Sequence, residues 1–369
     1  MRSFDVRVAG SGIVGKALAL SLARLGLAVA LRGAPALPGA REDVRAYALN
    51  PGSIALLRGL KVWDALPADV RTPVRDMLVH GDAAGAALEF SAWEQRVGEL
   101  AVITDAAALE RELDSALRFA PHVTLVEADV PADLVAHCEG RAAAALEGLG
   151  AGIETRSYEQ KAIAARLVAA RPHGHVARQW FRSPDVLALL PFDRPEADRS
   201  YALVWSLPAD KAVALLAAEP AAFEAELALA TGGEAGELRL ASERAAWPLA
   251  VGGAAAWCGP GWVLAGDAAH VVHPLAGQGL NLGLADVAAL VSVIEAKEPW
   301  RRLGDERLLR RYVRLRAAPT SAMLRITDGL LRLFAEDKAP IRDLRNNGLN
   351  LVNRISPLKR WLTARALDS

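Results

Sequence analysis

Cysteine is scarce in this chain. Cys138 and Cys258 are the only two cysteines among 369 residues, and they lie far apart. Two isolated thiols build neither a disulfide framework nor a cysteine metal cluster, so disulfide-rich folds and zinc ribbons are excluded. We expect both cysteines to be small packing residues in a reducing, cytoplasmic setting.

An excess of one charge sign and long apolar runs are also lacking. Lysine plus arginine number 43 and aspartate plus glutamate number 43, so the formal net charge is zero. This balance gives no electrostatic basis for nucleic acid as a partner. No run reaches the roughly 20 uncharged apolar residues of a membrane-spanning helix, and we expect no signal peptide in residues 1–8.

The chain does have a large apolar fraction, 52%, and enough length for two or three compact units. Near its start, Phe4–Ala9 alternates as a strand does, and Gly10-Ser11-Gly12-Ile13-Val14-Gly15 follows at once. Lys16–Leu25 has the spacing of a helix, and Leu27–Leu31 predicts a second strand. In this order of elements, a Gly-x-Gly-x-x-Gly turn indicates a dinucleotide site.

Each glycine of this turn is expected at its position for a physical reason. Gly10 allows the tight turn, Gly12 lets the backbone approach a pyrophosphate, and Gly15 lets the helix pack on the strand. The helix N-terminus then offers free N–H groups and its positive dipole end to the phosphates.

One expected part of the dinucleotide site is missing. An acidic residue should end the second strand and bind the ribose hydroxyls. Arg32 stands there instead, and Glu42 and Asp43 follow only after a loop rich in proline and glycine. Arg32 is either a solvated charge, which we favour, or a contact for a phosphorylated ribose of the NADP type.

A second glycine-rich loop lies far along the chain. Trp262–Ala265 predicts a buried strand that delivers Gly266-Asp267, and a helix is expected at Ala285–Glu295. Between them, residues 270–284 contain two histidines, one proline and three glycines. An aspartate at such a strand end can accept hydrogen bonds from polyol hydroxyls, and a helix N-terminus can stabilise negative charge on a planar ring.

The run GDAAHVVHPLAGQGLNLGLADVAAL, residues 266–290, resembles the ribityl-binding motif of class A FAD-dependent monooxygenases. It is most similar to the ubiquinone-biosynthesis hydroxylases. Segments along most of the chain agree with this resemblance: Asp43–Asn50, Phe90–Trp93, Ala188–Pro191, and Arg244 with Trp247-Pro248-Leu249.

The resemblance implies a set of cofactor contacts and no metal. Gly10, Gly12 and Gly15 would hold the FAD pyrophosphate, and Ile13 and Val14 would also bind the cofactor. Arg45 would lie along the cofactor and Asp267 would bind its ribityl chain. The isoalloxazine ring would be lined from the second loop by Pro274, Gly277, Gln278 and Gly279. Leu280 and Asn281 would also bind the cofactor.

The implied activity is hydroxylation of a polyprenyl-phenol ring in ubiquinone biosynthesis. The reaction would use O₂ and NAD(P)H and pass through a flavin C4a-hydroperoxide, because the cofactor carries the hard chemistry. No catalytic side chain is assigned. His270 and His273 are expected to shape the flavin loop rather than to bind a metal.

The chain departs from the family pattern at one further place. Glu139, after His137-Cys138, stands where the family has an aspartate that helps to bind FAD and the nicotinamide cofactor. Two altered cofactor contacts, Arg32 and Glu139, keep an alternative open: a non-catalytic accessory homologue that binds lipid or a partner hydroxylase.

The expected fold is α/β, with a Rossmann-like FAD-binding domain formed by residues 1–75, 101–160 and 251–300. Residues 76–100 and 161–250 would form a β-sheet substrate domain, and residues 301–369 a C-terminal helical region. Four aromatic residues of the substrate domain could line a pocket or pack in its core, and we favour the core: Trp180, Phe181, Phe192 and Trp205.

The last part of the chain is rich in arginine and leucine. Leu324–Phe334 and Leu344–Leu367 repeat apolar residues at helical spacing. A basic amphipathic helix can lie on an anionic membrane, or it can pack on the FAD domain, which we favour. The expected location is therefore cytoplasmic, with peripheral contact at the inner membrane left open.

Overall fold

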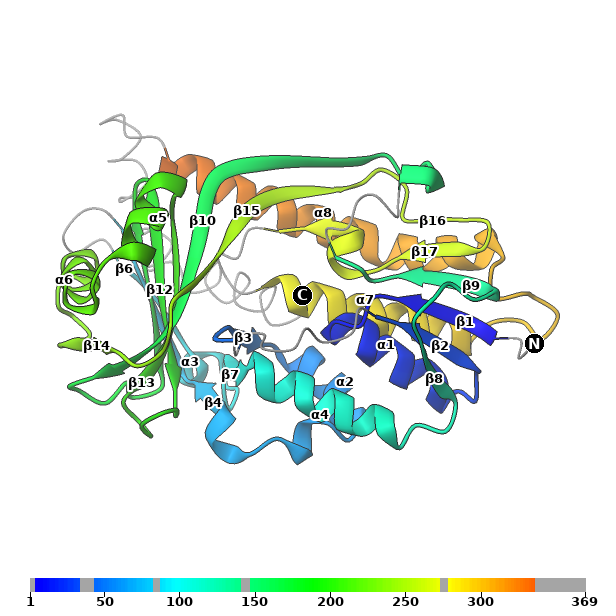
Figure 1. Ribbon diagram of the computed structural model, residues 1–369, viewed down its shortest axis with the longest axis horizontal. Helices are drawn as coiled ribbons and strands as arrows, with labels where there is room; N and C mark the ends of the chain where they lie inside the picture. The colour runs from blue at the N-terminus through cyan, green and yellow to red at the C-terminus, as the bar shows by residue number, and fades with distance from the viewer. Residues whose placement is uncertain (1–3, 34–42, 82–86, 141–146, 273–277, 336–369) are drawn as a thin grey trace.

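A computed structural model describes residues 4–33, 43–81, 87–140, 147–272 and 278–335. It has two large sheets at opposite ends of an elongated molecule, with two long helices running between them (Figure 1). The α/β class expected from the sequence is confirmed.

The first sheet is built mostly from parallel strands. Its six strands are, in spatial order, β16 (Cys258–Gly259), β17 (Trp262–Leu264), β9 (Ala132–His137), β1 (Phe4–Ala9), β2 (Val29–Arg32) and β8 (Val123–Val126). Only the β16–β17 pair is antiparallel. The predicted strand at Phe4–Ala9 is confirmed residue for residue, because buried valines alternate with less buried positions.

Helices cover this sheet and connect its strands. α1 (Ile13–Arg24) begins three residues before the predicted start, because Gly12 is still extended and caps it. Its alanines and leucines, Ala17, Leu18 and Leu22 among them, are fully buried. α4 (Ala106–Arg118) is capped by Asp105, whose side chain accepts a hydrogen bond from the Ala108 N–H at 2.8 Å.

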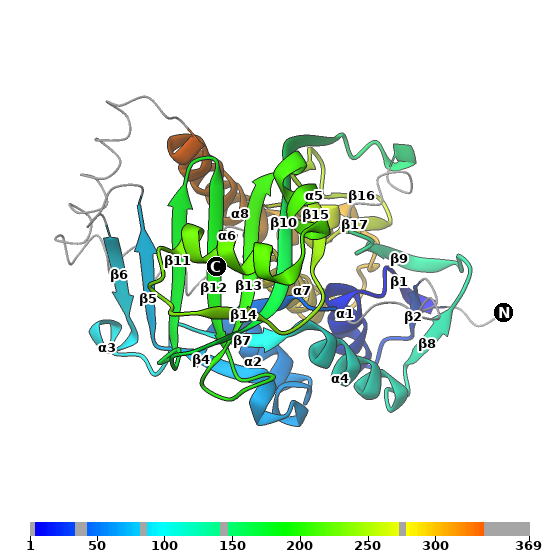
Figure 2. The ribbon, with the colours of Figure 1, turned by 60° about the vertical axis from the view of Figure 1, so that its left-hand side comes forward.

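The second sheet has nine strands and is mostly antiparallel (Figure 2). Its path is β18 (His270–Val271), β15 (Ala245–Ala254), β10 (Ile153–Ala169), β13 (Ser200–Pro208), β12 (Asp185–Phe192), β11 (Val176–Arg182), β5 (Asp76–His80) and β6 (Ala87–Ser91), with β14 (Leu238–Leu240) beside β10. The long strands β10 and β15 reach from this sheet toward β16 and β17 (Figure 1).

Two helices, α5 (Ala209–Ala217) and α6 (Pro220–Thr231), cover the outer face of the nine-stranded sheet. Trp180 and Trp205 pack beneath them in one apolar cluster with Phe223. Phe181 and Phe192 are buried in two smaller clusters. The preference for core packing of these four aromatic residues is confirmed.

A small third sheet joins the two halves. It consists of β3 (Ala46–Leu49), β7 (Ala101–Asp105) and β4 (Arg71–Val74). The remaining described helices are α2 (Pro51–Gly59), α3 (Ala92–Gln95) and the short 3₁₀ turns η1 (Trp63–Ala65), η2 (Ala68–Val70), η4 (Glu147–Leu149) and η5 (Gly266–Ala268).

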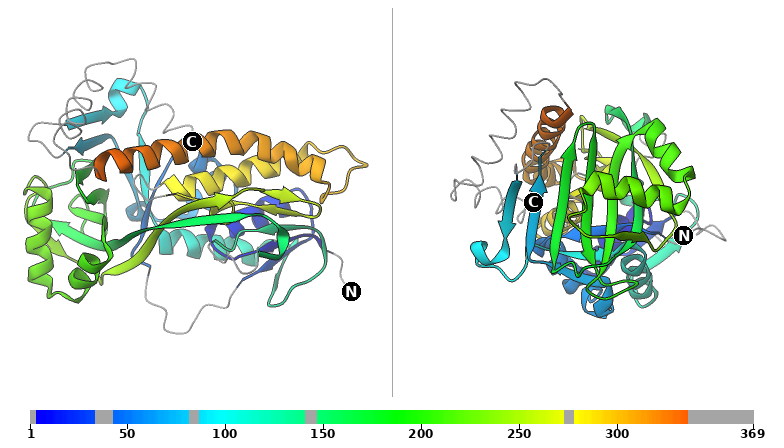
Figure 3. Two further views of the ribbon diagram at one scale, coloured as in Figure 1. Left: turned by 90° about the horizontal axis from the view of Figure 1, so that it is seen from above. Right: turned by 90° about the vertical axis from the view of Figure 1, so that its left-hand side faces the viewer.

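The two long helices, α7 (Gln278–Glu295) and α8 (Glu306–Ala335), lie side by side (Figure 3). α7 begins seven residues before the predicted start at Ala285, so the end of the second glycine-rich loop is itself helical. α8 contains the first predicted C-terminal helix, Leu324–Phe334; the second, Leu344–Leu367, lies outside the described residues.

By length and hydropathy, α7 alone among the described helices could cross a membrane. Half of that stretch is buried inside the fold, and it carries Asp286 and Glu295. A core helix of a globular protein has the same length, hydropathy and partial burial, so these properties do not make α7 a membrane span.

Candidate functional site: a dinucleotide cradle between two helix N-termini

The turn after β1 has the geometry that its three glycines predict. Gly10 has a φ of +106°, and a Cβ there would lie 2.5 Å from the carbonyl carbon of Cys138. A Cβ at Gly15 would lie 1.9 Å from the Gly10 oxygen, so larger residues are excluded at both positions. Gly12 is exposed, and no described atom lies within 4 Å of a Cβ placed on it. The N-terminus of α1 therefore faces open space, as a pyrophosphate cradle requires.

The two glycine-rich motifs meet at Val14. A Cβ at Gly283 would lie 2.7 Å from Val14 Cγ2, and one at Gly266 would lie 3.3 Å from Val14 Cγ1. Ile13 beside it is buried in the core. The Val14 side chain thus joins α1 to the second motif, and the backbone N–H groups at the start of α1 remain for a ligand.

The second motif presents one exposed carboxylate. Gly266 has a φ of +62°, and Asp267 is exposed whereas Gly266 and Ala268 on either side of it are buried. The turn thereby holds the Asp267 side chain out of the core, directly after Gly266, which lies against Val14 of α1. An aspartate in this position fits a polyol ligand such as a ribityl chain.

The start of α7 supplies the rest of this loop. Gln278, Gly279 and Leu280 form its first turn and are half-buried. A Cβ at Gly279 would touch Val272 Cγ2 at 3.5 Å. Pro274, Gly277 and His273 lie outside the described residues.

Asn281 differs from the expectation for a cofactor ligand. It is 1% exposed, and its Oδ1 accepts hydrogen bonds from the Asn50 N–H at 3.0 Å and the Ser53 hydroxyl at 2.8 Å. Its Nδ2 donates to the Ala48 carbonyl at 2.8 Å. The Asn281 side chain therefore ties α7 to the β3–α2 segment and is not turned toward a ligand.

Beneath the second motif lies a buried ionic network that the sequence did not reveal. Asp286 is fully buried and its Oδ2 accepts hydrogen bonds from the Gly266 N–H at 3.0 Å and from His270 Nε2 at 2.6 Å. Its Oδ1 accepts from Arg316 Nε at 2.8 Å. Burial alone would raise the pKa of Asp286, but His270 and Arg316 outweigh it and hold this pKa below its ordinary value.

The Asp286 network fixes the η5 turn to α8. Gly266 is the residue before Asp267, so the carboxylate of Asp286 sets the turn that exposes Asp267. In the sequence, Asp286 stands out as an acidic residue inside an apolar helix, which indicates a buried partner. The sequence does not identify Arg316 as that partner, because its segment contains several arginines.

Arg45 lies just before β3 and beside the nine-stranded sheet, where its carbonyl accepts a hydrogen bond from Arg166 Nη2 at 3.0 Å. Its guanidinium donates to both oxygens of Asp43 and lies over the Trp247 ring at 5.3 Å. Burial alone would lower the pKa of Arg45, but Asp43 raises it, and burial raises the pKa of Tyr47 to about 12. Arg45 is thus kept charged near Trp247 of the Arg-x-x-Trp-Pro-Leu segment.

At the end of β2, Arg32 is not the solvated charge that we favoured. Its side chain is 33% exposed and pairs with Glu139 at 2.8 Å and with Asp129. Glu139 is also bound by His137 Nδ1 at 3.1 Å. The two departures from the family pattern are therefore partners of each other.

The two cysteines behave as expected from the sequence. Both are free thiols in the structure, and both pack against the main core. Burial raises the pKa of each thiol, so neither has the character of a reactive thiolate.

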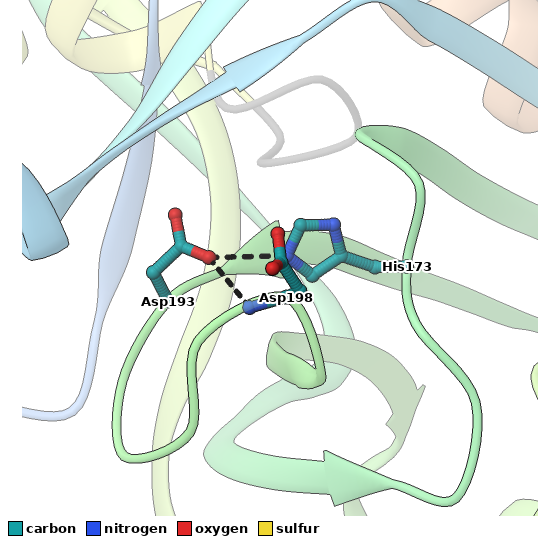
Figure 4. A group of neighbouring side chains, drawn as sticks. All are labelled: His173, Asp193 and Asp198. Carbon is teal, nitrogen blue, oxygen red and sulfur yellow. Dashed lines mark hydrogen bonds and ion pairs between the residues drawn. The ribbon is translucent and has the colours of Figure 1, made fainter.

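A cluster of His173, Asp193 and Asp198 has the composition of a metal site (Figure 4). However, His173 Nδ1 accepts a hydrogen bond from the His175 N–H at 3.0 Å, so a neutral ring carries its proton on Nε2, which faces Asp193. Asp193 in turn accepts from Thr72 and from the Asp198 N–H. The cluster ties loops of the nine-stranded sheet to β4.

A groove of about 540 Å³ opens at the other end of α1, among Ala23, Lys61 and Phe119. These residues lie at the C-terminal ends of α1, α2 and α4, remote from Gly12. The groove is therefore separate from the dinucleotide cradle.

Known proteins resemble the whole chain. The family described as "FAD binding domain" matches residues 90–327. The ubiquinone hydroxylase UbiL of Rhodospirillum rubrum is 33% identical over 99% of this chain and 90% of that protein. The 3-demethoxyubiquinol 3-hydroxylase of Escherichia coli is 30% identical over 98% of each chain.

Solved structures share the fold at lower identity. PqsL of P. aeruginosa, in complex with 2-aminobenzoylacetate, has a TM-score of 0.76 at 19% identity and covers 95% of this chain and 100% of its own. HpxO of Klebsiella pneumoniae, complexed with FAD and uric acid, has a TM-score of 0.71 at 17% identity and covers 98% and 97%. At these identities the likeness concerns the fold alone.

Proposed function

The chain belongs to the ubiquinone-biosynthesis hydroxylases among the FAD-dependent monooxygenases, and we propose that it hydroxylates the ring of a polyprenyl phenol. It is an enzyme, and its cofactor is FAD. The observation that carries the proposal is the convergence of the N-termini of α1 and α7 on the exposed Asp267, through the contacts of Val14 with Gly266 and Gly283. The alternative of a non-catalytic accessory homologue finds no support.

The residues of the cradle fit FAD. The open space over Gly12 would receive the pyrophosphate, Asp267 would accept hydrogen bonds from the ribityl hydroxyls, and the first turn of α7 would face the ring system. When bound, FAD would accept electrons from NAD(P)H and activate O₂, which the protein side chains cannot do. The protein would bind and orient FAD and the phenol substrate and exclude water from the site.

The inner face of the nine-stranded sheet carries small apolar residues, which suit contact with an apolar aromatic ring. On β10, Ile163 and Ala165 point to the cluster beneath α5 and α6, so the alternating Ala162 and Ala164 face the FAD half. The buried Arg166 on the same face lies over Phe192 at 4.2 Å. We propose that the phenol ring lies between this small-residue face and the flavin loop.

We also propose a domain organisation for the chain. Residues 1–75, 101–160 and 251–300 form the FAD-binding domain, residues 76–100 and 161–250 the substrate domain, and the last part a helical region. Membership of β5 and β6 in the nine-stranded sheet supports the assignment of residues 76–100. NAD(P)H would be the reductant. The protein would work in the cytoplasm, with peripheral contact at the inner membrane from which its lipid substrate is drawn.

The test begins with the visible absorption spectrum of the purified protein, before and after addition of FAD. A bound-flavin spectrum is expected. NAD(P)H oxidation and O₂ uptake with a prenylated phenol should then yield a product heavier by one oxygen atom. Asp267→Ala provides the matched control, since it should bind FAD about ten- to a hundredfold more weakly and keep the fold. A chain that binds no flavin in excess FAD would overturn the proposal.

A further inference from the structure

Arg32 and Glu139 meet across the first strand of the dinucleotide fold. Arg32 ends β2 and His137 ends β9, and both are in register with Ala9 of β1, which lies between them. A side-chain pair between residues 32 and 139 must therefore pass the end of β1, where the glycine-rich turn begins.

Both members of the pair abut Gly10. The Gly10 N–H donates to the Arg32 carbonyl at 2.8 Å, and a Cβ on Gly10 would lie 2.7 Å from the Glu139 nitrogen. The side chain of Glu139 is only 11% exposed, whereas that of Arg32 is 33% exposed. The carboxylate is therefore held at the mouth of the dinucleotide cradle, largely out of water.

The protein holds both oxygens of this carboxylate. Oε1 is 2.8 Å from Arg32 Nη2, and Oε2 is 3.1 Å from His137 Nδ1. Burial lowers the pKa of His137, so the ring is a neutral donor. A carboxylate oxygen has two acceptor positions, so each oxygen keeps one for a hydroxyl group.

The same contacts argue against a phosphate site at Arg32. One of its Nη atoms faces Glu139 and the other faces Asp129, which also binds Arg7 at 2.9 Å. The guanidinium charge is thus already neutralised by carboxylates. In return, Arg32 cancels the charge of Glu139, which would otherwise repel a nearby pyrophosphate.

From this geometry we propose that Glu139 binds the adenosine ribose of FAD, in place of the acidic residue missing from the end of β2. The carboxylate comes from β9, one strand beyond β1, and Arg32 and His137 are its positioning residues. This inference rests on the FAD site of the proposed function and adds a contact to it. It also explains why glutamate stands at residue 139, because aspartate would be too short to keep the Arg32 contact.

The experiment compares the affinities of FAD and of its 2′-deoxyadenosine analogue by quenching of flavin fluorescence. A hydroxyl-to-carboxylate hydrogen bond predicts that the native chain binds FAD about ten- to a hundredfold more tightly than the analogue. Glu139→Gln and Glu139→Asp should reduce this preference toward unity. The matched control is Asp129→Asn, which also removes a carboxylate from Arg32 and should keep the preference.

Each outcome decides a separate point. Equal binding of the two flavins by the native chain would overturn the ribose contact and leave the FAD enzyme standing. An equal loss of FAD and FMN affinity in Glu139→Gln would overturn it too, because FMN has no adenosine. Thermal unfolding of the flavin-free variants shows that they fold. Failure of the native chain to bind any flavin would overturn the proposed function and this inference together.

Discussion

The two ends of the dinucleotide cradle hold charge in different ways. At the end formed by the second glycine-rich motif, Asp286 is fully buried, and its contacts come from three different segments, namely the η5 turn, His270 and α8. At the end formed by the Gly10 turn, Arg32 and Glu139 are partly exposed and are bound to each other. A deeply buried charge cannot change alone, because its partners would be left uncompensated. The two residues of a partly exposed pair can be substituted together at low cost. Arg32 and Glu139 form such a pair, and both depart from the family pattern.

The largest expected effect comes from Asp286→Asn. The change leaves Arg316 and His270 buried without their carboxylate, and breaking such a network costs about 3–5 kcal/mol of unfolding free energy. FAD affinity should fall as well, since the Gly266 turn loses its anchor. Chemical denaturation and flavin titration measure the two effects.

The control for Asp286→Asn is Asp133→Asn, which breaks the exposed pair with Arg302. A surface pair of this kind contributes about 0–1 kcal/mol. The pH profile gives a second check. The folded pKa of Asp286 lies below its ordinary value, so its contribution is complete above about pH 4 and is lost as the pH falls further. If the variant keeps the acid sensitivity of the native chain, the network does not carry this stability.

Asp267→Ala should separate binding from stability at the same end of the cradle. Asp267 is exposed, so its removal should change the unfolding free energy by less than about 0.5 kcal/mol. Loss of the ribityl contact should weaken FAD binding about ten- to a hundredfold. Unchanged FAD affinity, measured by fluorescence titration, would contradict the ribityl role of this residue.

The sequence predicted the elements of the site better than the contacts between them. The strand Phe4–Ala9 and the glycines of its turn follow local rules, because alternation and a tight turn are set by neighbouring residues. The predicted start of α7, Ala285, is seven residues later than the observed one. Gly279 and Gly283 are typical of a loop, but here they lie inside the helix and let it pack closely against its neighbours.

Contacts between distant segments could not be predicted from such local sequence rules. Arg32 and Glu139 are 107 positions apart, and each was recognised as unusual, but their pairing depends on the order of β9, β1 and β2 in the sheet. Asp286 needs Arg316, and only the packing of α8 on α7 selects that arginine among its neighbours. Asn281 was assigned to the cofactor because it lies in the motif, whereas its side chain holds α2.

A double-mutant cycle on the flavin-free protein sharpens the contrast between the two ends. Arg32→Ala and Glu139→Gln should show a coupling of about 1 kcal/mol in unfolding free energy, because the pair is only partly shielded from water. This coupling should be clearly smaller than the effect of Asp286→Asn. A coupling of 3 kcal/mol or more, of the order found for buried pairs, would remove the distinction between the two ends.

The smallest effect is expected away from the cradle, at His173. Burial lowers the pKa of His173, although Asp193 opposes this. The unfolded chain then binds protons more readily than the folded chain, so stability should fall as the pH drops below about 6.5, by at most roughly 1.4 kcal/mol per unit of pKa difference. Denaturation curves at several pH values should show a shallower loss for His173→Gln than for the native chain. Since the Nε2 proton of the neutral ring faces Asp193, added Zn²⁺ should leave the melting temperature unchanged. A rise in melting temperature that His173→Gln abolishes would make this cluster a metal site instead of a tie between loops.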